Sequence, residues 1–142
     1  MTPKSRMALV LFFVASGLTS VPLIGAAQTA ESLGTVRLTQ NVVANGQPLA
    51  AGTYTARLSA ETPSRVVGQP ADSTRWVEFV AGGQVKGREL ATVVPAADVK
   101  QVAKGTPPPQ GTARVQTLRG GEYIRVWLNR AGTQYLIHLS VK

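Results

Sequence analysis

The sequence predicts an all-β protein, a single antiparallel β-sandwich with one short helix, and three observations carry this prediction. Short runs rich in valine, threonine, leucine and tyrosine follow one another along the chain. Apolar and polar residues alternate within them, as at 36–39 and 54–59, which places one side of each strand in a core. Turn signals separate the runs, at Asn45-Gly46, Gly82-Gly83, Gly120-Gly121 and 129–132. Strands at this spacing indicate a sandwich or a small barrel of roughly seven to eight strands, and we expect the sandwich.

The first 27 residues have the pattern of a secretory signal peptide. Lys4 and Arg6 precede an apolar run at 7–14, and small residues close the segment at 25–27. We expect cleavage after Ala27 and an exported protein of the periplasm or the extracellular space. If it is not cleaved, the segment instead anchors the chain, because its length approaches the roughly 20 residues that span a bilayer. The serine, glycine, threonine and proline in its second half favour cleavage.

Cleavage divides the chain into a signal peptide at 1–27, a flexible lead-in at 28–34 and one β-domain at 35–142. Removing 27 residues from 142 leaves 115, which is enough for a hydrophobic core. The chain has no cysteine, which excludes disulfides, thiolate metal sites, a cysteine nucleophile and a lipid-modified N-terminus. A second apolar run of spanning length is absent from the sequence, so we expect no transmembrane segment after cleavage.

The charge balance is basic, with a formal net charge of +8. Without Lys4 and Arg6 the exported chain keeps 13 basic and 7 acidic side chains, a net charge of +6. An exported protein rarely meets nucleic acid, so we expect no nucleic-acid partner. The expected partners are an envelope protein or an anionic polysaccharide or lipid surface. Alternatively, the charge serves solubility only. The oligomeric state is left open by the sequence.

One short helix is expected near 95–104, before a proline-rich connector. Pro95 suits a first helical turn, Val99, Val102 and Ala103 form an apolar stripe, and the following glycine can end the helix. The segment 106–111 cannot pair in a sheet, because its three prolines lack an N–H group.

Hairpin loop lengths decide which residues lie opposite one another. Around Gly82-Gly83 we predict a three-residue loop, which places Phe79 opposite Val85 and Trp76 opposite Arg88. This register gives an apolar face and a cation–π pair. A loop with an even number of residues would instead set Phe79 opposite Lys86.

The C-terminal strands are expected to form a three-stranded meander. The predicted registers place Val115 opposite Val126, and Val126 opposite Tyr135, so one face is apolar throughout. The other face carries aromatic, basic, amide and leucine side chains, namely Arg114, Gln116, Leu118, Tyr123, Arg125, Trp127, Gln134, Leu136 and His138.

This mixed face is the candidate binding surface. Tyrosine and tryptophan give rigid contact area, and arginine gives directed hydrogen-bond donors. A structural alternative stays open, in which the helix residues Val99 and Val102 cover the face and Arg114 shields the Trp127 ring. The candidate binding residues are Arg114, Tyr123, Arg125, Trp127 and His138.

A catalytic, metal or cofactor site is not expected. His138 is the single histidine, and no carboxylate stands near it in the sequence. Glu78 and Glu89 point to opposite faces of their hairpin and cannot act as an acid–base pair. Metal-ligand spacings, phosphate loops and a nucleophile elbow are all absent from the sequence. A hydrolase that uses His138 is a further alternative, and it requires a carboxylate within hydrogen-bonding reach.

Residues 43–55 resemble a segment of exported bacterial β-sandwich proteins with the pattern N-G-x-x-L-P-A-G-T-Y. Such segments recur in uncharacterised secreted families and in transthyretin-like or carboxypeptidase-regulatory-like modules. This chain departs from the pattern at Ala50, where proline is usual. The resemblance implies an immunoglobulin-like or transthyretin-like sandwich, in which Asn45-Gly46 forms a turn, Gly52 opens a strand and Tyr54 enters the core. It carries over no catalytic residue.

Together these observations predict an exported, non-catalytic binding or interaction module of the cell envelope. The alternative is a structural subunit of a surface assembly, joined through edge strands. Residues 36–43 are the candidate edge, because they form a long uncharged run apart from Arg37.

Overall fold

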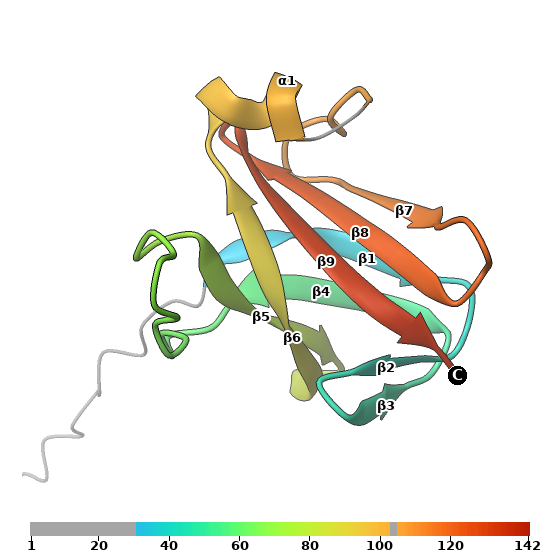
Figure 1. Ribbon diagram of the computed structural model, residues 1–142. Coiled ribbons are helices and arrows are strands. Elements are labelled where there is room, and N and C mark those ends of the chain that lie inside the picture. Colours follow the sequence, from blue (N-terminus) through green and yellow to red (C-terminus); the bar gives the residue numbers. More distant parts are fainter. Residues whose placement is uncertain (1–30, 103–104) are drawn as a thin grey trace, which may run out of the picture.

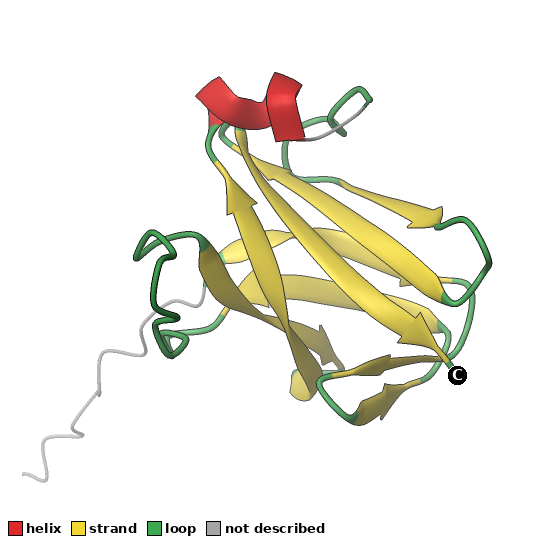
Figure 2. Cartoon of the chain, viewed as in Figure 1, coloured by secondary structure: helices red, strands yellow, loops and turns green. Residues whose placement is uncertain are grey.

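The computed structural model describes residues 31–102 and 105–142 (Figures 1 and 2). The predicted all-β antiparallel fold with one short helix is confirmed. The predicted signal peptide at 1–27 lies outside the described residues. Neither of the helical segments in the described ranges could span a bilayer. The elements in chain order are β1 (Ser32–Leu38), β2 (Val42–Ala44), β3 (Gln47–Leu49), β4 (Gly52–Leu58), β5 (Thr74–Ala81), β6 (Gln84–Val94), the 3₁₀ turn η1 (Ala96–Asp98), α1 (Val99–Val102), β7 (Ala113–Thr117), β8 (Tyr123–Arg130) and β9 (Thr133–Val141).

Hydrogen-bonded ladders join the nine described strands into one continuous sheet. The order runs β1-β4-β5-β6-β9, after which β9 pairs with β8 and with β2, β8 pairs with β7, and β2 pairs with β3. The sheet curls so that β1 and β4 face β8 and β9 (Figure 1). An isolated parallel bridge from Thr35 to Thr112 brings the two ends of the sheet together. The sandwich prediction assumed two separate sheets, whereas the pairing joins all the described strands into one.

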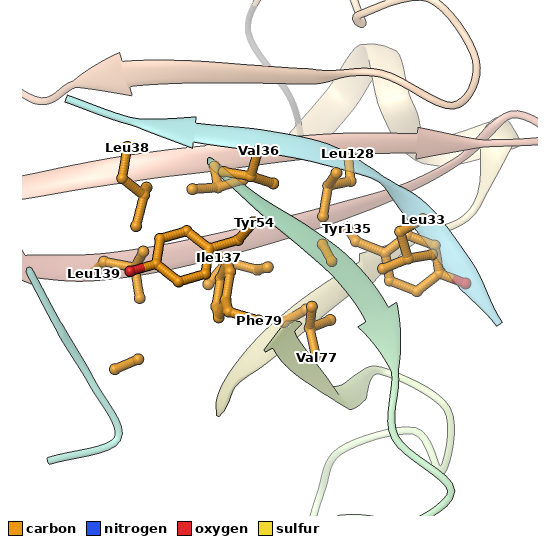
Figure 3. Packing of buried hydrophobic residues seen from close by; sticks show 14 of the residues in the cluster. Leu33, Val36, Leu38, Tyr54, Val77, Phe79, Leu128, Tyr135, Ile137 and Leu139 are labelled. Atoms are coloured by element: carbon orange, nitrogen blue, oxygen red, sulfur yellow. The ribbon is translucent and has the colours of Figure 1, made fainter. Parts of the chain in front are cut away.

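The hydrophobic core fills the inside of this curl (Figure 3). Val36 and Leu38 on β1 are buried, as their alternation with polar residues predicted. The Tyr54 ring on β4 packs edge-on against Phe79 on β5, with ring centroids 6.3 Å apart and an interplanar angle of 86°. Leu128 of β8 and three side chains of β9 complete the packing from the opposite side, namely Tyr135, Ile137 and Leu139.

The predicted flexible lead-in at 28–34 is too long at its C-terminal end. Leu33 is 1% exposed and belongs to the core, so β1 begins at Ser32. Gly34 interrupts the alternation just after Leu33, which is why the sequence pattern did not include the first three residues of the strand. Residues 28–30 lie outside the described part of the chain.

The segment 43–55 has the local structure that was expected of it. Asn45 and Gly46 both adopt positive φ angles, 45° and 79°, in a two-residue turn between β2 and β3. The next strand, β4, opens at Gly52. Tyr54 is buried, and its hydroxyl donates a hydrogen bond of 2.6 Å to the carbonyl of Ala50.

The hairpin of β5 and β6 does not have its predicted register. The turn has two residues, Gly82-Gly83, and a bulge between Phe79 and Val80 shifts the pairing by one residue. Phe79 therefore lies opposite Gly87, and the predicted pairing with Val85 is wrong. A bulge arises from local backbone conformation, which the alternation of side chains does not record.

The meander of β7, β8 and β9 is confirmed in one register and corrected in the other. Val115 lies opposite Val126 as predicted. Val126 lies opposite Ile137 rather than Tyr135, because the turn between β8 and β9 has two residues, Ala131-Gly132, and not four. The error is two residues, so every side chain keeps its predicted face.

The predicted edge at 36–43 is not one continuous strand. Its first part belongs to β1, which pairs with β4, and residues 39–40 form a bend. Its last part belongs to β2, which pairs with β3 on one side and β9 on the other. The run is thus divided between β1, which stands at one end of the strand order, and β2, which has a partner on each side. Assembly through edge strands stays a prediction.

Candidate functional site

Trp127 is the buried centre of the predicted binding face. Its side chain is 0% exposed and packs in a small second cluster with Val94, Val99 and Leu136. Figure 1 shows α1 above the end of the β8–β9 hairpin, where Val99 reaches this cluster. The prediction of Trp127 as a ligand-contacting residue is thus corrected, because the helical segment covers it. Val102, predicted to share in this cover, is 53% exposed.

The buried indole is held by a specific hydrogen bond. Trp127 Nε1 donates to Oε1 of Gln134 at 2.5 Å, and Gln134 Nε2 donates to the carbonyl of Gly132 at 3.1 Å. Gln134 is itself 1% exposed, so this pair satisfies polar groups that water cannot reach. The orientation of the indole is therefore fixed by a hydrogen bond to a buried side chain.

Two arginines lie against the Trp127 ring. The guanidinium carbon is 6.0 Å from the ring centroid for Arg114 and 5.6 Å for Arg125. Arg114 Nη1 donates to the carbonyl of Thr106 at 2.6 Å. Arg125 donates to Oε1 of Gln116 through Nε at 3.2 Å and through Nη2 at 2.7 Å. Both guanidinium groups are held in place by uncharged partners.

Neither arginine has a carboxylate partner within the described ranges. The ion pairs found there join Arg57 to Glu78, Arg88 to Glu61 and Arg130 to Glu31. A guanidinium has five N–H donors, and these two use only part of that capacity. Because both side chains are already oriented, binding an anion would cost little further side-chain entropy. The arrangement is suited to carboxylate, phosphate or sulfate groups.

His138 and Tyr123 border this arginine pair on the same side of the sheet. His138 lies opposite Arg125 in the β8–β9 ladder, and both His138 and Tyr123 are exposed. Partial desolvation of the imidazole by its neighbours, and secondarily the positive charge of Arg125, lower the pKa of His138 below its usual 6.5. The histidine is therefore neutral near pH 7.

A shallow pocket beside His138 also contains Glu89, which the sequence did not place near the histidine. The pocket forms where β9 changes partner from β6 to β2, and it is lined by Val43, Asn45, Gly46, Glu89, Tyr123, His138 and Ser140. Glu89 Oε2 accepts the backbone N–H of Asn45 at 2.5 Å, and Oε1 accepts that of Leu90 at 2.9 Å. No sequence signal joins Glu89 to His138, because their proximity depends on how β2 docks beside β6.

The carboxylate contact that a hydrolase would require is not formed. Across the described ranges, no hydrogen bond or ion pair connects His138 to Glu89 or to another carboxylate. As the sequence predicted, Glu78 lies on the opposite face of its hairpin from Glu89, and it pairs with Arg57 at 2.7 Å. No group of three or more potential metal ligands occurs in the part of the chain that is described.

A second concave region lies between the loop 59–73 and the outer side of β5 and β6. There the Arg88 guanidinium carbon lies 4.6 Å from the centroid of the Trp76 ring, so the predicted cation–π contact exists. The predicted pairing is nevertheless wrong, since Trp76 lies opposite Leu90 and Arg88 reaches it diagonally. Glu61 neutralises Arg88, so this region attracts an anion less strongly than the surface around Trp127 does.

The structure thus brings together Arg114, Arg125 and Trp127, and it sets His138 and Tyr123 at their border. Gln116 and Gln134, which hold this group in place, were already on the predicted face. No family model, curated protein or solved structure matches the chain.

Proposed function

We propose that this protein is an exported, non-catalytic binding module of the cell envelope that recognises an anionic polymer. The ligand-contacting surface, called the arginine face below, consists of Arg114, Gln116, Tyr123 and Arg125. Trp127 serves it from beneath as a rigid platform. The observation that carries the proposal is the pair of arginines oriented on one buried indole without a carboxylate partner in the described ranges.

The shape of the arginine face favours a polymer over a small anion. Its residues follow two neighbouring strands, with Gln116 opposite Arg125 and Arg114 opposite Trp127. Alternate residues along a strand are roughly 6.8 Å apart, so the donors form a row on an open surface. A ligand with repeated charges can contact this row at several points, and the excess of basic residues over the whole chain adds long-range attraction.

Export rests on the signal-peptide pattern of residues 1–27 and is tested first. The full chain, expressed in a bacterial host, is expected in the periplasm or the medium with Gln28 as its first residue, read by mass spectrometry. A product that keeps residues 1–27 in the membrane fraction would contradict cleavage and indicate an anchored form.

The arginine face is tested with the exported protein and dextran sulfate, with neutral dextran as the comparison polymer. We expect binding to dextran sulfate only, weakening as salt increases. The double variant Arg114→Gln/Arg125→Gln is expected to lose about tenfold or more in affinity, because two oriented charge-assisted donors are removed.

The matched control is the double variant Arg65→Gln/Lys86→Gln, which removes the same net charge at exposed positions elsewhere. It is expected to change affinity by no more than about twofold. Equal losses in the two double variants would contradict a specific site and leave only a general effect of net charge. Urea unfolding of each variant checks that the fold is retained.

Vesicles distinguish a polymer from a lipid surface. Binding to phosphatidylglycerol vesicles without binding to dextran sulfate would overturn the choice of a polymer. Binding to neither would contradict the anion-binding function itself.

A further inference from the structure

We propose that His138 couples anion binding at the arginine face to proton uptake, so that the ligand is held more tightly as the pH falls. The inference rests on the proposed function, since it concerns how that same surface is regulated. The protonated imidazole would act together with Arg125 on one anionic group of the ligand.

The register brings His138 next to the ligand-contacting surface. His138 on β9 and Arg125 on β8 are direct partners in the ladder, and directly opposed side chains lie on the same face of a sheet. His138 is exposed, so an incoming anion can reach it. A sulfate, phosphate or carboxylate bound by Arg125 would therefore lie within reach of the imidazole.

The groups around His138 leave its positive charge uncompensated. Arg125 on β8 is a cation and Tyr123 is uncharged. From β9 itself come the neutral side chains Leu136 and Ser140, and from the turn between β2 and β3 come Asn45 and Gly46.

The one carboxylate facing the pocket, Glu89 on β6, is occupied by backbone donors. Each of its two oxygens accepts a main-chain N–H, from Asn45 and from Leu90. It forms no ion pair with His138. Protonation of His138 in the free protein therefore sets two cations opposite one another, and an anion from outside is the group that would relieve their repulsion.

Proton and ligand then assist each other by thermodynamic linkage. Partial desolvation and the charge of Arg125 lower the pKa of His138 in the free protein. A bound anion would raise that pKa again, because it favours the charged imidazole. By reciprocity, protonation must raise the affinity for the anion by the same factor.

The test uses dextran sulfate, whose sulfate groups stay ionised across the range, so a change with pH reports on the protein. For the exported protein we expect affinity at about pH 5 to exceed that at about pH 8 by about threefold to tenfold. In His138→Gln the ratio of the two affinities is expected to fall close to one. Arg65→Gln serves as the control and is expected to keep the wild-type ratio.

NMR measures the titration of His138 directly, because the imidazole resonances belong to the single histidine of the chain. The titration midpoint is expected below 6.5 without polymer and at a higher pH with dextran sulfate. Binding that is independent of pH, with an unshifted midpoint, would overturn the role of His138 and leave the arginine face in place. Absence of binding at every pH would instead contradict the proposed function, and this inference with it.

Discussion

The Trp127 side chain is fully buried and packs against Val99, with the guanidinium groups of Arg114 and Arg125 close to its ring. Alternation along the strand places this residue on the outer side of the sheet, but it gives no sign of what covers it there. The indole orients the two guanidinium groups, because an aromatic face attracts a guanidinium without neutralising its charge. The hydrogen bond to Gln134 fixes the indole, so the arrangement of the arginine face depends on a residue that no ligand can touch.

Gln134→Leu is expected to destabilise the fold by about 2 kcal/mol, because it leaves the buried Trp127 Nε1–H without an acceptor. Urea unfolding measures the loss. In the double variant Trp127→Phe/Gln134→Leu both partners of the bond are gone. Its loss should be smaller than the sum of the two single losses, by about 1 kcal/mol. Strict additivity would contradict the bond as described.

Turns decide the registers of the elements. The β8–β9 turn is formed by Ala131 and Gly132, both at positive φ, and it matches the Asn45-Gly46 turn of β2 and β3. Alanine is poorly suited to a positive φ, which is why the sequence pointed to a longer loop at 129–132. Both corrections amount to two residues, since in β5 and β6 a turn shorter by one residue is combined with a bulge of one residue. The predicted faces are therefore kept in both hairpins, although different side chains meet.

Ala131→Asn is expected to stabilise the protein by about 0.5–1 kcal/mol, because asparagine adopts a positive φ at lower cost than alanine. Asn45→Ala is the reciprocal variant and should destabilise it by a similar amount. Both changes are read from chemical denaturation midpoints. A destabilising Ala131→Asn would argue against the two-residue turn.

The whole molecule is closed where the two ends of the sheet meet. At this seam the chain passes Gly34 close to Gly111, the bridge joins Thr35 to Thr112, and Glu31 forms an ion pair with Arg130. A Cβ at Gly34 would lie 2.5 Å from the carbonyl oxygen of Gly111, which is too close for any side chain. Gly34 is therefore required for closure.

Gly34→Ala is expected to destabilise the protein by about 3 kcal/mol, since it adds a clash with backbone to the strain of its φ of 142°. Gly120→Ala separates these two causes. Gly120 has a φ of 96° but nothing within 4 Å of its Cβ position, so it should cost only about 1 kcal/mol. Similar losses in the two variants, measured by urea unfolding, would contradict a tight seam at Gly34.

The sequence by itself determined the faces of the strands, most of the turns and the short helix. Alternation assigns Val36 and Ile137 to the core and Arg114, Arg125 and His138 to the outer side, because side-chain direction has a period of two whatever the strand pairs with. Glycine and asparagine mark turns for an equally local reason, the cost of a positive φ.

Only the tertiary structure decided which strands adjoin, how the sheet curls and what covers its outer side. Those features depend on contacts between residues far apart in the chain, for which one sequence contains no local signal. The burial of Trp127 under Val99, the closure at Gly34 and the position of Glu89 in the same pocket as His138 all belong to this class. The residues of the candidate face could be named from the sequence, but the burial of Trp127 and the exposure of His138 beside Arg125 required the packed molecule.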